Sequence, residues 1–331
     1  MKVLVTGASG MLGRATAQAL IERGDEVSVF QRRPSGVACR EVLGDVADPT
    51  AVRRALRGQD AVLHLAAKVD VVGRWSDYAR ANIDGTRTVV EGCLAQGVGR
   101  LVHVSTPSVA HSGRSLVGAG AGPADPAGAR GHYARSKAVA ERLALSADSA
   151  ALAVLAVRPH LVWGPGDTQL VARIVARAEA GRLPVLGTGA ALIDTTYVDN
   201  AGAALVAAVD ACGPAHGEPL VVTNGEPRPV REVLTRLCLA AGAPTPRFRV
   251  PAWLARHAGT AVDGVWAVTR RQDQPPISRF LAEQLTTAHW FDQRRTRDVL
   301  AWRPEIDLDS GFDRLAAWYR GQRKAADPVT A

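Results

Sequence analysis

Cysteine is scarce in this chain and widely spaced. Its four cysteines are Cys39, Cys93, Cys212 and Cys238, and no two of them form a CxxC pair, so neither a zinc site nor a disulfide framework is indicated. The sequence also lacks an apolar run of about 18 residues, the length of a membrane span. Its first expected strand begins at Lys2, which leaves no room for an export signal. These absences favour a cytoplasmic protein.

Long blocks of basic residues are also missing, although the net charge is +8. The arginines are scattered or occur in pairs, such as 32–33 and 53–54. Nucleic-acid-binding proteins usually concentrate such charge into a patch or stripe. We therefore expect no nucleic-acid partner. A dispersed positive surface is compatible with small anionic ligands.

Short β-branched runs alternate with Ala-, Leu- and Arg-rich helical segments through the first half of the chain. KVLVTG, EVSVF, AVLHLAA and RLVHVS are the clearest runs. Strands alternating with helices predict a parallel sheet covered on both faces, which is a Rossmann-type, doubly wound α/β fold. We assign residues 1–165 to a dinucleotide-binding core.

The second half is less regular. We assign residues 166–321 mainly to a smaller substrate-binding lobe, with some segments returning to the core, and residues 322–331 to a flexible tail. Residues 112–131 are rich in Gly, Ala and Pro and show no sustained period. This composition predicts a loop.

The stretch TGASGMLG follows the first expected strand and opens a helix at about Met11. Gly7, Gly10 and Gly13 are three residues apart, and glycine at these places allows a sharp turn and a close approach of backbone amides to a pyrophosphate. A glycine triplet between an N-terminal strand and a helix favours dinucleotide binding over a structural turn. The expected contacts from this stretch are Gly7, Ser9, Gly10, Met11, Leu12 and Gly13.

The end of the second expected strand distinguishes two dinucleotides. NAD enzymes usually place Asp or Glu there to bind the ribose 2′-hydroxyl, but this chain reads VFQRRPS. Arg32 and Arg33 could hold a 2′-phosphate through charge-assisted hydrogen bonds. The sequence therefore favours NADP(H), with NAD(H) as the alternative. An exposed arginine pair that contributes little is the other interpretation.

Two further stretches follow expected strands. GDVAD contains Asp45 and Val46, and HLAA contains Leu65, Ala66 and Ala67. Residues at the carboxyl ends of parallel strands line the crevice in which such ligands bind. We include all five among the candidate cofactor contacts, although each could equally belong to the core.

The stretch YARSK places Tyr133 one helical turn before Lys137. A free tyrosine has a pKa of about 10, so it exchanges protons poorly at neutral pH. An ammonium at about 4 Å, in an effective dielectric of about 20, contributes up to about 4 kcal/mol, which is about what that task requires. We therefore expect Lys137 to tune Tyr133 as an acid and base. Ser105 and Thr106 end a strand upstream and could bind a substrate oxygen beside the phenol.

These stretches occur together with others in a recognisable order. TGASGMLG, HLAA, NIDGT, VSTPSV, YARSK, RPHLVWGPGD and TTYVDNAGAALVAA resemble the extended short-chain dehydrogenase/reductase family. STPSV, TNGEPRPVREVL and PPISRF…HWFD resemble its 3β-hydroxysteroid dehydrogenase-like branch. The resemblance implies an oxidoreductase that interconverts a ketone and a secondary alcohol, with a β-oxo acid such as a 2-alkyl-3-oxoalkanoate or a sterol as substrate.

The resemblance also implies roles for individual residues. Tyr133 would donate or accept the proton, and Lys137 would bind the nicotinamide ribose. Thr106 matches the catalytic hydroxyl, with Ser105 as the second choice. The turn Pro159-His160-Leu161 would pass the nicotinamide.

Asn82 would lie on the helix beneath the nicotinamide. His160 and His132 are each more simply explained as packed or solvated side chains.

One departure from the family bears on the reaction. Nucleotide-sugar dehydratases carry an acidic pair directly after the catalytic hydroxyl, whereas Thr106 is followed by Pro107 and Ser108. Simple redox chemistry is therefore favoured over dehydration. An NAD-retaining nucleotide-sugar epimerase and a non-catalytic NADP(H)-binding sensor remain alternatives, although such sensors commonly lack the Tyr/Lys pair.

The second half suggests an apolar substrate. We expect residues 112–131 to form an apolar cover over it. Five aromatic side chains add apolar bulk, unless they only build the core of the lobe: Trp163, Trp253, Trp266, Trp290 and Phe291. Residues 251–271 could gate the substrate, pack in the core or lie on a membrane surface. A homodimer is a further expectation from the family resemblance.

Overall fold

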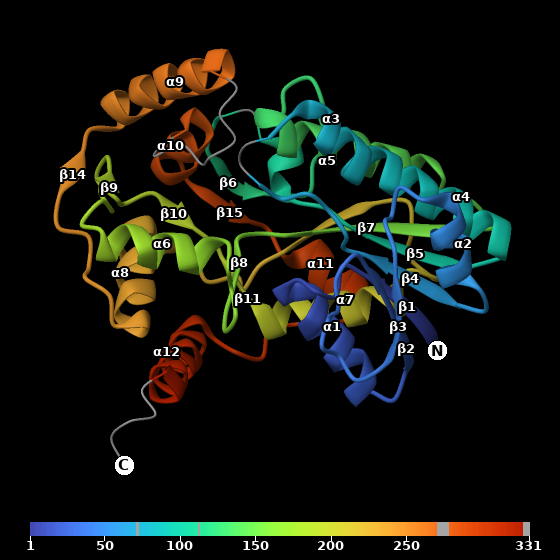
Figure 1. Ribbon diagram of the computed structural model, residues 1–331. Helices are drawn as coiled ribbons and strands as arrows, with labels where there is room; N and C mark the ends of the chain where they lie inside the picture. Colours follow the sequence, from blue (N-terminus) through green and yellow to red (C-terminus); the bar gives the residue numbers. More distant parts are fainter. Residues whose placement is uncertain (71–72, 112, 270–277, 327–331) are drawn as a thin grey trace.

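A seven-stranded parallel sheet forms the centre of the protein (Figure 1). The structure is a computed structural model that describes residues 1–70, 73–111, 113–269 and 278–326. The strand order is β12-β7-β5-β4-β1-β2-β3. The bounds of these strands are β1 (Lys2–Thr6), β2 (Glu26–Gln31), β3 (Arg40–Leu43), β4 (Ala61–His64), β5 (Arg100–Val104), β7 (Ala153–Pro159) and β12 (Pro219–Val222).

Helices cover both faces of this sheet because its strands are apolar on both sides. Val3 and Val5 of β1 pack with α1 (Met11–Glu22) and α7 (Val198–Ala211) on one face. Leu4 between them packs on the other face, with α2 (Pro49–Leu56), α4 (Gly85–Gln96) and α5 (Gly131–Ser146). This alternation follows from the period of two in a strand. The predicted doubly wound α/β fold is confirmed.

The remaining elements form most of the second half of the chain. A four-stranded sheet has the order β13-β10-β15-β6. Figure 1 shows α6, α8, α9 and α10 on the same side of the central sheet. The bounds here are β6 (Leu116–Ala119), β8 (Val162–Trp163), α6 (Leu170–Glu179), β9 (Val185–Leu186), β10 (Leu192–Ile193), β11 (Thr196–Tyr197), β13 (Arg228–Pro229), α8 (Val230–Ala241), β14 (Arg249–Val250), α9 (Ala252–Thr269), α10 (Arg279–Thr286), β15 (His289–Phe291), α11 (Arg294–Leu300) and α12 (Leu308–Ala326).

Segments from the second half also build the central core. β12 pairs with β7 along the edge of the sheet, and α7 packs against α1. Leu300 and Trp302 belong to the same apolar cluster as β1. The division into a core and a substrate-binding lobe, with its boundary at residue 165, stays a prediction.

Two expectations about irregular segments are wrong. Residues 112–131 do not form only a loop, because β6 lies within them and pairs with β15. Residues 322–326 are not a loose tail, because α12 continues to Ala326. Residues 327–331 lie outside the described residues.

Within the stretch 251–271, residues 252–269 form α9, and residues 270–271 lie outside the described ranges. Trp253 at its start is 65% exposed, so the beginning of this helix is not a core element. Within the described ranges, no helix is both long enough and apolar enough to cross a bilayer.

Candidate active site

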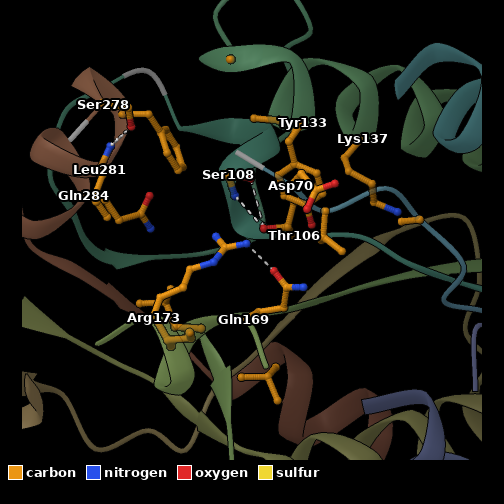
Figure 2. Close-up of a pocket in the computed structure, with 18 of the residues that line it drawn as sticks. Asp70, Thr106, Ser108, Tyr133, Lys137, Gln169, Arg173, Ser278, Leu281 and Gln284 are labelled. Carbon is orange, nitrogen blue, oxygen red and sulfur yellow. Dashed lines mark hydrogen bonds between the residues drawn. The ribbon is translucent and has the colours of Figure 1, made fainter. Parts of the chain in front are cut away.

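A cavity of about 1610 Å³ lies at the carboxyl ends of β1, β4, β5 and β7. α6, α9 and α10 supply the opposite wall, and Figure 2 shows side chains from both sides directed into the cavity. Thirteen of the predicted site residues line it: Gly7, Gly10, Met11, Leu12, Gly13, Leu65, Ala67, Thr106, Tyr133, Lys137, Pro159, His160 and Leu161. The topology thus brings together residues that are up to half the chain apart.

The glycine turn has the geometry expected of a pyrophosphate site. Gly7 has a φ of +81°, and its amide donates to the Phe30 carbonyl at 3.0 Å. A Cβ at Gly13 would lie 2.4 Å from the Gly7 carbonyl oxygen, a distance that no side chain tolerates. Gly10 caps α1 without a side-chain hydrogen bond. Unpaired amides at the start of α1 therefore face the cavity, where an anion would be stabilised.

The remaining predicted residues, all within the described part of the chain, do not line the cavity: Ser9, Arg32, Arg33, Asp45, Val46, Ala66 and Asn82. Arg32 and Arg33 are exposed directly after β2, the strand that neighbours the glycine turn. Burial acts to raise the pKa of Asp45, but bonds from the Ala47 amide and Arg80 outweigh it and lower that pKa. These positions surround the glycine turn from outside.

Asn82 braces the wall of the cavity. It lies in η1 (Ala79–Asp84), a π-helical segment inside the long helix that starts at Trp75. Its Oδ1 accepts from the Lys68 amide at 2.7 Å, and its Nδ2 donates to the Lys68 carbonyl at 3.1 Å. The same Nδ2 donates to Ser136 of α5 at 2.8 Å. Asn82 therefore fixes the segment after β4 against the helix that carries Tyr133.

Two hydroxyl groups follow β5. Thr106 Oγ1 lies 3.1 Å from Ser108 Oγ, and it is close enough to the Tyr133 hydroxyl to lower the pKa of that phenol. Ser105 Oγ is buried and has no hydrogen-bond partner among the described residues. Thr106 is thus the hydroxyl that lies beside the phenol, while Ser105 lines the cavity separately.

Tyr133 and Lys137 lie one turn apart on α5, and both reach the cavity (Figure 2). Burial raises the pKa of Tyr133 to about 12, and the bond with Thr106 only partly opposes this. Lys137 is 3% exposed. Its ammonium donates to the Val104 carbonyl at 2.6 Å and lies 3.4 Å from His103 Nε2. Burial lowers the pKa of Lys137 to about 8.

That Lys137 tunes Tyr133 stays a prediction. The Lys137 ammonium is held at the end of β5 by its bond to the Val104 carbonyl. Burial raises the pKa of Tyr133, and Thr106 is the group that acts against this effect. Tyr133 is therefore a fully protonated phenol at neutral pH.

The turn after β7 carries local strain. Leu161 has a φ of +43°, a backbone angle that residues other than glycine rarely adopt. His160 is buried, its Nδ1 lies 2.6 Å from the Asp194 carbonyl oxygen, and burial lowers its pKa to about 4. It is thus a neutral, packed histidine. His132 is exposed and bonds the Gly73 carbonyl. Neither is placed as an acid or base.

The apolar cover predicted from residues 112–131 is wrong, because β6 is paired and only Arg130 and Gly131 from that stretch line the cavity. Of the five aromatic residues named in the sequence, only Trp266 is among the described lining residues. Trp163 instead stacks on Phe312 in the core, with ring centroids 4.5 Å apart.

Sequence reasoning missed the side chains of α6 and α10. Gln169, Arg173 and Arg177 line the cavity from α6 or the residue before it, and Gln284 lines it from α10. A signal was present in LVARIVARA, where two arginines four residues apart interrupt an apolar helical face. Nothing in the sequence alone showed that this helix lies opposite Tyr133.

Comparisons with known proteins agree with this geometry. The NAD dependent epimerase/dehydratase family matches residues 3–222. The 2-alkyl-3-oxoalkanoate reductase of Stenotrophomonas maltophilia is 42% identical over 96% of this chain and 99% of its own length. The mouse sterol-4-alpha-carboxylate 3-dehydrogenase, decarboxylating, is 27% identical over 98% and 92%. MoeE5, solved in complex with UDP-glucose and NAD, superposes with a TM-score of 0.75 at 26% identity, covering 98% of this chain and all of its own.

The site also fits a nicotinamide dinucleotide on its own evidence. Added Cβ atoms at Gly7 and Gly13 would strike neighbouring backbone at 2.9 and 2.4 Å, so glycine keeps this turn as tight as a pyrophosphate-binding turn must be. Tyr133 and Thr106 line the same cavity. The chain therefore belongs to the NAD-dependent epimerase/dehydratase family, the extended short-chain dehydrogenases/reductases, and is an NAD(P)-dependent oxidoreductase of CH–OH and C=O groups.

Proposed function

We propose that the protein reduces the ketone of a lipid-like β-oxo acid, such as a 2-alkyl-3-oxoalkanoate, to a secondary alcohol, with NADP(H) as the preferred cofactor. The observation that carries the proposal is that the Thr106 hydroxyl lies close enough to the Tyr133 hydroxyl to lower its pKa, in an otherwise largely apolar cavity. Two hydroxyls at one point can hold a carbonyl oxygen and deliver a proton to it.

In this mechanism Thr106 donates a hydrogen bond to the carbonyl oxygen and orients it. Tyr133 then gives its proton to that oxygen as the alcohol forms. The bound nicotinamide supplies the hydride to the carbonyl carbon. A phenol whose pKa burial raises to about 12 carries its proton at neutral pH, which is the state from which the reduction starts.

Lys137 stabilises the phenolate that this proton transfer leaves. Its ammonium is held against β5, one turn from Tyr133. Because burial lowers the pKa of Lys137 to about 8, the positive charge is present below that pH and is lost above it. We therefore expect the reduction rate to fall as the pH rises through about 8.

The apolar walls support a lipid-like substrate. Ile174, Leu183, Leu234, Leu285 and Trp266 line the side of the cavity opposite the glycine turn. The relative at 42% identity is named for the reduction of a 2-alkyl-3-oxoalkanoate. Both observations favour a branched β-oxo acid over a sugar nucleotide.

The preference for NADP(H) is supported by the end of β2. Gln31 is the last residue of that strand. It is followed by Arg32 and Arg33, which are exposed, and not by an acidic residue. Glu41 accepts from the Ser35 amide at 2.8 Å and from Gln31 at 2.6 Å. This carboxylate therefore orders the loop that carries the two arginines.

The test is a screen of NADPH oxidation with three substrate classes: long-chain 2-alkyl-3-oxo acids, 3-oxosteroids and UDP-sugars. We expect turnover of the 2-alkyl-3-oxo acids with NADPH, and slower turnover with NADH. Interconversion of a UDP-hexose without net cofactor oxidation would contradict the proposal.

Oxidation of a sterol-like 3-hydroxy acid is the second candidate, favoured by the 27% identity to sterol-4-alpha-carboxylate 3-dehydrogenase. It requires Tyr133 as a base, which its raised pKa opposes. Turnover of a sterol 3-alcohol with NADP⁺ that exceeds reduction of the β-oxo acids would favour this candidate.

Contact with a membrane surface, a homodimer and a cytoplasmic location all stay predictions. Phe248, which precedes β14, is exposed, as are Trp253 and Leu254 at the start of α9. Arg247 and Arg249 flank Phe248 in the sequence. Apolar side chains among arginines suit contact with an anionic membrane surface. Sedimentation with phosphatidylglycerol vesicles tests this contact, and gel filtration with light scattering tests for a homodimer.

A further inference from the structure

α6 faces two environments. Val171, Ile174, Val175 and Ala178 are buried in the apolar cluster of the second half. Arg173, between them in sequence, lines the cavity, and Figure 2 shows its guanidinium directed into the open space below Thr106 and Ser108. The apolar side chains of α6 therefore pack in the core of the second half, while the Arg173 guanidinium lies in the cavity.

Three other arginines of the cavity bind carboxylates of the protein. Arg74 bonds Asp77 at 3.2 Å. Arg130 lies 3.3 Å from Glu283, and Arg279 bonds the same carboxylate at 2.9 Å. Their charges are balanced internally.

Arg173 differs from these arginines. Its Nη2 donates to Gln169 Oε1 at 2.6 Å, which is a neutral amide oxygen. A guanidinium has five N–H donors in a fork that matches a carboxylate. The bond to Gln169 uses one of them and holds the fork in the cavity.

The acidic side chains that line the cavity are engaged elsewhere. Asp167 caps α6 by accepting from the amides of Gln169, Leu170 and Val171. Asp70 pairs with Lys68 at 2.9 Å, and Asp263 accepts from the Arg279 amide at 3.0 Å. The charge of Arg173 is therefore directed at the cavity itself.

The charge of Arg173 also destabilises α6 as long as no anion is bound beside it. Burial lowers the pKa of Arg177, and the charge of Arg173 four residues earlier lowers it further. Like charges four residues apart on a helix repel each other and destabilise it. An anion bound between α6 and Thr106 would offset the repulsion between Arg173 and Arg177.

We infer that Arg173, oriented by Gln169, binds the carboxylate of the β-oxo acid and so selects acids over neutral ketones. This inference rests on the proposed function and adds a residue that determines substrate specificity. In a β-oxo acid the carboxylate is attached one carbon from the ketone, so holding it fixes the carbonyl relative to Thr106 and Tyr133. The apolar side chains Ile174 and Leu234 beside it favour an acid with alkyl chains over a diphosphate.

The experiment compares a 2-alkyl-3-oxo acid with its methyl ester, which keeps the ketone and loses the charge. We expect Arg173→Gln to lower kcat/KM for the acid by roughly 10- to 100-fold, the range of a hydrogen bond to a charged group, with little change for the ester. Arg173→Lys should recover part of the loss, because a point charge remains without the fork. Arg182→Gln, an exposed position just after α6, is the matched control and should behave as wild type.

The outcomes separate this inference from the proposed function. An equal loss for acid and ester in Arg173→Gln, with an unchanged melting temperature, would overturn the role of Arg173 while ketone reduction stands. If binding of a UDP-sugar, measured by calorimetry, is lost in Arg173→Gln while the acid is unaffected, the anion is a diphosphate and the inference is wrong. If wild type reduces neither acid nor ester, the proposed function itself fails.

Discussion

The two sides of the cavity are built in different ways. The cofactor side consists of strand ends and the turns directly after them, such as Gly7 after β1 and Leu65 after β4. The substrate side consists of helices α6, α9 and α10, which reach the site through packing between segments far apart in the chain. The first side is specified by local sequence patterns, whereas the second depends on tertiary packing. We therefore expect side chains of α6 to determine substrate selectivity.

Breaking a buried ion pair on the cofactor side should have the largest effect. Arg158 of β7 and Glu141 of α5 are each 1% exposed and form a buried ion pair. Arg158 also donates to the Gly122 carbonyl at 2.7 Å, in the segment between β6 and α5. Glu141→Gln leaves this cation buried without its charge partner and should lower the free energy of unfolding by about 3–5 kcal/mol.

Chemical denaturation measures this loss. The control is Arg314→Gln, which removes a half-exposed partner of Asp199 and should cost about 0–1 kcal/mol. Equal effects of the two substitutions would show that the buried pair stabilises the cofactor side no more than an exposed pair does.

The hydroxyls at the meeting point of the two sides should come next. Thr106→Val removes the group that bonds Tyr133 and should lower kcat for ketone reduction by about 100- to 1000-fold. Ser105→Ala is the matched control, because the Ser105 hydroxyl lies apart from the phenol. Steady-state kinetics measures kcat for both variants. A larger loss of kcat in Ser105→Ala would assign the proposed role of Thr106 to Ser105.

On the cofactor side, Gly13→Ala introduces a Cβ that would lie 2.4 Å from the Gly7 carbonyl oxygen. Relieving such an overlap costs about 1–3 kcal/mol, so NADPH affinity should fall by roughly 10- to 100-fold. Gly99→Ala, where nothing lies within 4 Å of the added atom, should leave it unchanged. Isothermal titration calorimetry measures both, and unchanged affinity in Gly13→Ala would place the phosphates elsewhere.

The smallest effect is expected for the choice of dinucleotide. Replacing Arg32 and Arg33 by alanine should raise KM for NADPH about tenfold or more, the loss of one or two charged hydrogen bonds, and leave KM for NADH near its original value. The exposed arginines 53–54 on α2 provide a control of equal charge. A parallel rise for both cofactors would assign the two arginines to the fold instead of to the 2′-phosphate.

The fold of the cofactor side could be predicted because its signals are local. The glycine spacing placed Gly7 and Gly13 correctly, and the helical period placed Tyr133 and Lys137 on one face. The bond from Lys137 to the Val104 carbonyl joins residues 33 positions apart. No local pattern encodes it, so the raised pKa of Tyr133 could not be foreseen.

The substrate side was less accessible for the same reason. β6 pairs with β15, although the two are far apart in the chain and β6 lies in a Gly-, Ala- and Pro-rich stretch. The position of Arg173 opposite Thr106 depends on how α6 packs against α8. Tertiary contacts overrode local propensity in the first case and gave an ordinary surface pattern a chemical meaning in the second.

The central claim is that the Tyr133 hydroxyl delivers the proton that turns the ketone into an alcohol. Its most direct test is the rate of NADPH-dependent reduction of a 2-alkyl-3-oxo acid by Tyr133→Phe at neutral pH. We predict a kcat lower than that of wild type by about 100- to 10,000-fold, with NADPH affinity retained. Reduction by Tyr133→Phe at the wild-type rate would contradict the account.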